Sequence, residues 1–144
     1  MRIVLDTDVV VAALRSPSGA SAELLRQARR GRIGLVASVS LFIEYESVCT
    51  RQRHLDAAGL EPGDVDVFLD ALGSLVEPVP IHFLWRPQLH DPADELVLEA
   101  AVNAGADALL SFNVRHFRRA AERFGLRVSP PGPFLKEFLE RYQA

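Results

Sequence analysis

The chain has 144 residues, of which 49% are apolar and 24% are charged, and its formal net charge is −3. This length suffices to bury a full core, so we expect a single domain over residues 1–144, and the negative charge argues against a protein that coats nucleic acid. A lone cysteine excludes an internal disulfide, and no apolar run nears the roughly 20 residues that cross a membrane, so we expect a cytoplasmic protein without membrane contact.

Apolar, strand-like runs alternate with amphipathic helical patterns along the chain. Strands are predicted over residues 2–6, 33–37, 108–112 and 127–129. Helices are predicted over residues 20–30, 39–51, 62–72, 92–104, 114–124 and 134–142. The proline-rich stretch 76–87 is expected to form at most a short, irregular edge strand. This alternation predicts an α/β fold with a parallel sheet wrapped by helices.

Two acidic residues, Asp6 and Asp8, follow the first predicted strand and lie between apolar segments. Burying a charge costs several kcal/mol unless a metal, a proton or a partner compensates it. In an open α/β sheet, ligands bind beyond the carboxyl ends of the strands, where Asp6 would lie. We therefore expect Asp6 to serve binding chemistry rather than helix capping, whereas Asp8 fits either a site or an N-cap.

Further acids lie where an inward-facing helix turn is predicted. Glu44 is part of a mostly apolar helical stretch, and Glu46 is the better candidate for a solvent-facing residue. Asp91, Asp94 and Glu95 begin a later helix, with Asp94 next to its apolar face. An N-cap at Asp91 with a capping box through Asp94 is the alternative interpretation.

Asn113 directly follows the predicted strand 108–112 and could either cap the following helix or orient a metal-bound water. Asp107 precedes that strand, so it lies at the wrong end to join Asp6. Carboxylate oxygens without cysteine or a close histidine pair select a hard cation, Mg²⁺ or Mn²⁺. The histidines are scattered, and we expect His54 and His116 at the surface. Carboxylate-bound Mg²⁺ is used chiefly for phosphate chemistry.

In order and spacing, these motifs resemble the PIN-domain ribonucleases, which include the VapC-like toxins of bacterial and archaeal toxin–antitoxin pairs. The resemblance covers nearly the whole chain. It rests on the segments Val4–Thr7, Ser16–Ala20, Ser38–Glu44, Asp91–Ala101 and Ala106–Phe117. It implies a three-layer α/β/α sandwich with a central, mainly parallel sheet, and Mg²⁺- or Mn²⁺-dependent cleavage of single-stranded RNA.

The resemblance also implies residue roles. Asp6, Glu44, Asp94 and Asn113 would be catalytic, and the metal would be held by Asp6, Glu44 and an acid of the pair Asp94 and Glu95, of which we favour Asp94. The chain departs from the family at two positions. It has Asp8 where Asn or Ser is frequent, and Asn113 where Asp is frequent, which removes a potential ligand of a second metal.

The resemblance further implies an RNA substrate and a cognate antitoxin. Fifteen of the sixteen basic residues are arginine. Arginine suits forked contacts to phosphate, so Arg15 or Arg115 could steady the RNA, although a GC-rich coding sequence enriches arginine equally well. The helix face with Leu41, Phe42 and Tyr45 suits a homodimer contact, or is simply core.

Two other functions compete with this interpretation. The opening Asp6-Thr7-Asp8 also fits a phosphatase of the haloacid dehalogenase type, but that chemistry needs a lysine between the acidic motifs, and the only lysine, Lys136, follows all of them. A non-catalytic binding module of the same fold is the other alternative, and Asn113 is the residue that favours it.

Overall fold

The computed structural model describes residues 1–84 and 88–143, and a five-stranded sheet forms its centre. The strand order is β3-β2-β1-β4-β5, and every neighbouring pair is parallel. The strands are β1 (Arg2–Leu5), β2 (Gly34–Ala37), β3 (Val76–Pro78), β4 (Ala108–Leu110) and β5 (Val128–Ser129). The predicted α/β fold with a parallel sheet is therefore confirmed.

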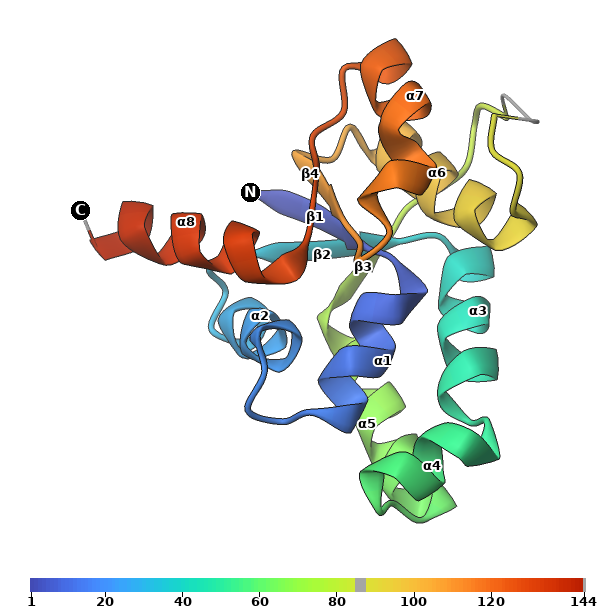
Figure 1. Cartoon of the computed structure of the whole chain (residues 1–144), viewed down its shortest axis with the longest axis vertical. Helices are drawn as coiled ribbons and strands as arrows, with labels where there is room; N and C mark the ends of the chain where they lie inside the picture. Colours follow the sequence, from blue (N-terminus) through green and yellow to red (C-terminus); the bar gives the residue numbers. More distant parts are fainter. Residues whose placement is uncertain (85–87, 144) are drawn as a thin grey trace.

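Helices cover both faces of this sheet. In chain order they are α1 (Thr7–Arg15), α2 (Ala20–Arg29), α3 (Val39–Cys49), α4 (Gln52–Ala58), α5 (Pro62–Leu75), α6 (Pro92–Ala104), α7 (Val114–Phe124) and α8 (Pro131–Gln143). Figure 1 shows α6 and α7 on one side of the sheet and α1 and α2 on the other. This is the three-layer arrangement that the family resemblance implied.

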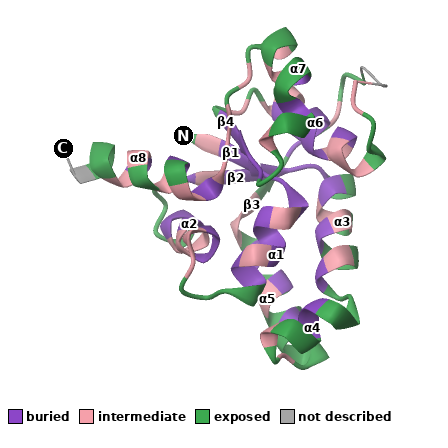
Figure 2. Cartoon of the chain, in the orientation of Figure 1, coloured by how far each residue is buried: buried purple, intermediate pink, exposed green. Residues whose placement is uncertain are grey.

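The core lies between the central strands and the helices that face them, as the buried segments in Figure 2 show. Strands β1, β2 and β4 are buried on both faces, which explains why they read as continuous apolar runs. Leu41 and Tyr45 of α3 are fully buried and Phe42 packs against the core. Of the two interpretations of this helix face, core is therefore correct for Leu41 and Tyr45, and Phe42 is partly buried against them.

Two helices were absent from the predicted elements. They are α4 and α1; α1 begins at Thr7, directly after the first strand, near the helix that an N-cap at Asp8 would have implied. The stretch 76–87 contains a short edge strand, β3, as expected. Residues 85–87 lie outside the described part of the chain, as does the last residue of the expected domain 1–144. Within the described residues, no helix is long and apolar enough to cross a bilayer.

The strand order places a topological switch between β1 and β4. From β1 the chain proceeds to β2 and β3 on one side, and then crosses over to β4 and β5 on the other. The backbone N–H of Asp6 donates to the carbonyl of Leu110 over 2.8 Å, which joins the carboxyl ends of these two strands. Open α/β sheets bind ligands in the crevice at such a switch point.

Candidate active site

Asp6 lies at the switch point and is held by two hydrogen bonds. It follows β1 directly and occupies the N-cap of α1, where its Oδ1 accepts from the Thr7 N–H over 2.7 Å. Its Oδ2 accepts from the Ser111 hydroxyl, just after β4, over 2.6 Å. The prediction that Asp6 would not cap a helix was wrong, because the helix starts immediately after the strand. Asp6, and not Asp8, is the cap.

The Asp6 carboxyl is buried, with only 6% of the residue exposed. Burial and then the negative charges of Asp8 and Asp94 raise its pKa from 3.8 to about 7, although the hydrogen bonds from Ser111 and Thr7 act in the opposite direction. Asp6 is consequently close to half protonated at neutral pH. Such a carboxyl is poised to exchange its proton for a cation.

Asp8 extends the same acidic surface from the first turn of α1. Its Oδ2 accepts hydrogen bonds from the Phe112 N–H and from the Asn113 Nδ2, each over 3.1 Å. Its Oδ1 is buried and lacks a hydrogen-bond partner among the described residues. Burial raises the pKa of this carboxyl as well. A buried, unpaired acceptor is rare in proteins and needs a compensating group.

Asn113 orients Asp8 rather than capping a helix. It occupies the N-cap position of α7, but its side chain makes no capping hydrogen bond. Its backbone N–H instead donates to the Ser111 Oγ over 2.9 Å. Ser111 therefore links Asp6 to the start of α7. Sequence reasoning missed Ser111, whose only signal was its position at the carboxyl end of a buried strand.

Asp94 faces the same centre from the first turn of α6. Its Oδ2 lies 3.3 Å from the Nδ1 of His116, on α7. Burial and the charge of Asp91 raise the pKa of Asp94, and His116 acts to lower it. His116 is half exposed, as expected of a surface residue, but its contact with the site was not predicted.

The neighbouring acids Asp91 and Glu95 accept hydrogen bonds from backbone N–H groups. Asp91 caps α6 by accepting from the Ala93 N–H over 2.9 Å, which confirms the N-cap alternative. Glu95 is buried, and its Oε1 accepts from the backbone N–H groups of Gln88 and Leu89 over 2.6 and 2.8 Å. The Glu95 carboxylate therefore anchors the segment that precedes α6.

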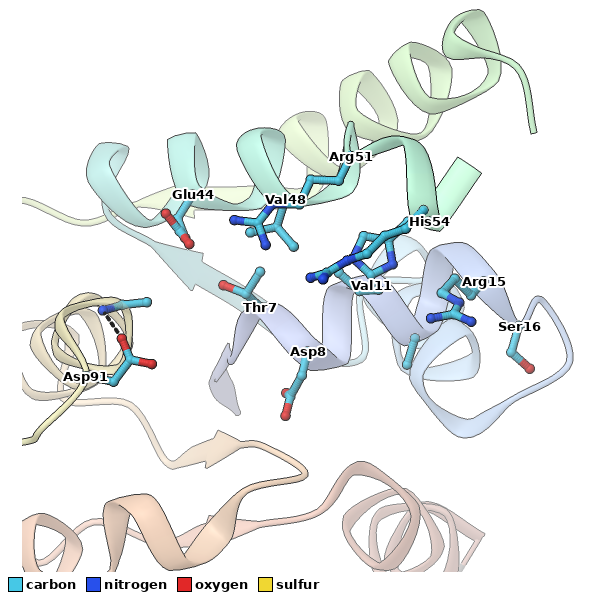
Figure 3. Close-up of a pocket in the computed structure, with 13 residues that line it drawn as sticks. Thr7, Asp8, Val11, Arg15, Ser16, Glu44, Val48, Arg51, His54 and Asp91 are labelled. Carbon is cyan, nitrogen blue, oxygen red and sulfur yellow. Dashed lines mark hydrogen bonds between the residues drawn. The ribbon is translucent and has the colours of Figure 1, made fainter. Parts of the chain in front are cut away.

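A cleft of about 790 Å³ opens beside these residues, between α1, α3, α4 and the start of α6. Figure 3 shows Glu44 and Asp91 at one end, Asp8 beside the first turn of α1, and Arg15, Ser16 and His54 at the other end. Glu44 makes no hydrogen bond or ion pair with another described residue.

A second hollow of about 580 Å³ adjoins this cleft, because Asp91 lines both of them. It contains Asp94 and His116 together with Arg115 and Arg119. The two arginines predicted to contact phosphate, Arg15 and Arg115, therefore lie in neighbouring hollows.

The donor chemistry of the site fits a hard divalent cation. Among the described residues, no three acidic, histidine or cysteine side chains are already arranged as metal ligands. Carboxylate oxygens are nevertheless what Mg²⁺ and Mn²⁺ prefer. The unpaired Oδ1 of Asp8 and the raised pKa of Asp6 both mark negative charge that lacks compensation.

Comparison with known proteins identifies the family. A family model described as the PIN domain matches residues 2–115, a range that contains every acid of the site. The chain belongs to the PIN domain family. No curated protein matches this PIN domain in sequence.

Among solved structures, this PIN domain is similar to a chain in the crystal structure of VapBC2 from Rickettsia felis bound to a DNA fragment from their promoter. The TM-score is 0.59 at 15% sequence identity, and the match covers 89% of this chain and 97% of the other. At this level of identity the likeness concerns the fold.

Proposed function

We propose that this PIN domain is a divalent-cation-dependent endoribonuclease that hydrolyses phosphodiester bonds in single-stranded RNA, built as a single domain over 1–144. The observation that carries the proposal is the uncompensated charge at the switch point. Asp6 is buried there with its pKa raised to about 7, and the Oδ1 of Asp8 is a buried acceptor without a hydrogen-bond partner among the described residues. A folded protein rarely retains this energetic cost unless a ligand offsets it.

Asp6, Glu44 and Asp94 would hold the cation, Mg²⁺ or Mn²⁺. Glu95 is the weaker candidate, because backbone N–H groups already occupy its Oε1. Such a cation supplies an activated water and stabilises the leaving oxygen. Ser111 fixes the Asp6 carboxylate through its hydroxyl, and Asn113 fixes Asp8 through its amide. These hydrogen bonds hold the acids in place before a substrate arrives.

Cleavage of a labelled single-stranded RNA tests the proposal. Wild-type protein should cut in Mg²⁺ and stop cutting in EDTA, and Asp6→Asn should lose at least about 100-fold in rate, the usual scale for groups that stabilise transition-state charge. Asp70→Asn, which alters an exposed carboxylate of α5, is the matched control and should cut normally. An Asp6→Asn protein that cuts as fast as wild type would refute the mechanism.

Calorimetric titration with Mn²⁺ distinguishes the enzyme from a non-catalytic module of the same fold. Binding that is lost in Glu44→Gln supports the enzyme, whereas a folded wild-type protein that binds no Mn²⁺ supports the module. The phosphatase alternative is less well supported than the nuclease, because the chain belongs to the PIN domain family and Lys136, on α8, is not among the residues that line the cleft.

We further propose that the protein is the toxin of a toxin–antitoxin pair, acts in the cytoplasm, binds a cognate antitoxin and forms a homodimer. The fold likeness to a chain of VapBC2 supports an antitoxin partner. Induced expression should arrest growth, Asp6→Asn should not, and co-expression of the adjacent small reading frame should restore growth. Growth unaffected by active protein would contradict the toxin role. Light scattering on the purified chain tests the homodimer.

A further inference from the structure

The end of the cleft away from Glu44 is strongly basic. Arg15 at the end of α1 and Arg53 in α4 line it, together with His54, and the side chain of Arg51, the N-cap of α4, extends beside Val48 in the middle of the cleft (Figure 3); we call these four residues the arginine end. All three arginines are exposed, and none of their guanidinium groups makes a hydrogen bond or ion pair with another described residue. Three cations gathered without an acidic partner favour an anionic ligand.

His54, which is buried in the wall of the cleft, also favours a ligand at this end. It is 7% exposed, and neither ring nitrogen has a hydrogen-bond partner among the described residues. The prediction that His54 lies at the surface was therefore wrong, because α4 packs it against α1. Burial and the charges of Arg53, Arg15 and Arg51 lower its pKa, so its imidazole is neutral near pH 7. A buried polar group that lacks a partner is expected to meet one in the functional complex.

We propose that the arginine end is a subsite for a phosphate of the RNA backbone, in which His54 donates a hydrogen bond to a phosphate oxygen beside the three guanidinium groups. The inference rests on the proposed function, because the same cleft runs from these residues to Asp8 and Glu44. An RNA strand lying along the cleft would place one phosphate at the acids and another phosphate at the arginine end. Arginine forks suit such phosphate oxygens.

The charges around His54 couple its protonation to the binding of an anion at the arginine end. Cations face the imidazole from α1 and α4, whereas the acids Asp8, Glu44 and Asp91 line the rest of the cleft. A bound anion offsets the three guanidinium charges, and the second ring nitrogen can then take up a proton. Binding of the anion and protonation of His54 therefore favour each other.

Sulfate is a suitable probe, because it keeps its two charges throughout the pH range in which histidine titrates. In EDTA, NMR of the His54 imidazole should show its pKa rising by about one pH unit or more in sulfate, relative to chloride at equal ionic strength. Arg15→Gln and Arg53→Gln should each weaken sulfate binding about fivefold. Arg118→Gln, in a separate hollow on α7, is the matched control and should bind like wild type. A His54 titration that is identical in sulfate and chloride would overturn the proposal.

A second measurement uses a fluorescent single-stranded RNA in EDTA, so that binding is followed without cleavage. His54→Gln and Arg15→Gln should weaken binding about fivefold relative to Arg118→Gln. Equal affinity in all three variants, or stronger competition by a duplex DNA of the same length, would contradict the subsite. If His54→Gln fails to fold, the RNA affinity of the exposed variant Arg15→Gln still tests the subsite. RNA bound in this manner but left uncut in Mg²⁺ would refute the nuclease proposal and leave the subsite standing.

Discussion

Replacing Asp6 by Asn should stabilise the metal-free protein at the cost of its activity. The fold raises the pKa of Asp6 from 3.8 to about 7, and one pH unit corresponds to about 1.4 kcal/mol, so the total is about 4 kcal/mol. Because the folded state prefers the protonated carboxyl, this stability is present below about pH 4 and is lost as the pH rises to about 7. Asn avoids that loss, but it accepts from only one of the two donors, which costs about 1.5 kcal/mol.

The net expectation is that Asp6→Asn is more stable than wild type by about 2 to 3 kcal/mol at pH 8, and that the advantage disappears near pH 4. Urea denaturation in EDTA at several pH values measures it, with Asp70→Asn as the exposed control that should follow wild type. Adding Mg²⁺ should stabilise wild type and leave Asp6→Asn unchanged. A stability difference that stays constant from pH 4 to pH 8 would refute the assignment of Asp6 as a buried, uncompensated acid.

Three further substitutions test individual contacts. Ser111→Ala removes a donor that lowers the pKa of Asp6, so the variant should bind Mn²⁺ more weakly than wild type at pH 7 and about equally at pH 9, as measured by calorimetry. A variant that binds Mn²⁺ as tightly as wild type at pH 7 would contradict this prediction. Asn113→Asp replaces the donor to Asp8 with a like charge, so the metal-free protein should lose about 1 to 3 kcal/mol and bind more Mn²⁺. Tyr45→Phe leaves the carbonyl that ends β1 without its buried donor and should cost about 1 to 3 kcal/mol in urea denaturation, with an unchanged midpoint as the contrary result.

The elements of the fold that could be predicted are those whose burial leaves a regular pattern of apolar residues in the sequence. Strands β1, β2 and β4 are buried on both faces and read as apolar runs, and the longer amphipathic helices were recognised by their periodicity. Helix α1 was hidden because Val9, Val10 and Val11 form a β-branched run that favours a strand locally. Its burial between the sheet and its helical neighbours overrides that preference.

The site was predictable where acids follow strands or interrupt apolar helix faces, as Asp6 and Asp94 do. Its supporting residues were not, because they are defined only by contacts between distant segments. Ser111 is an ordinary strand-end serine until β4 places its hydroxyl on a carboxylate 105 positions earlier. His54 is likewise an ordinary polar residue of a short helix until α4 packs against α1.

The distance in sequence between Asp6 and Ser111 also governs when the protein can become active. Asp6, Asp8 and Glu44 leave the ribosome long before Ser111 and Asn113 do, and until then Asp6 lacks the donor from Ser111 and Asp8 lacks the donor from Asn113. Contacts between residues so far apart in sequence form late in folding, because closing a long loop costs entropy. In a nascent chain the acids are therefore present before their hydrogen-bond donors, and the candidate site is assembled only with the last third of the polypeptide.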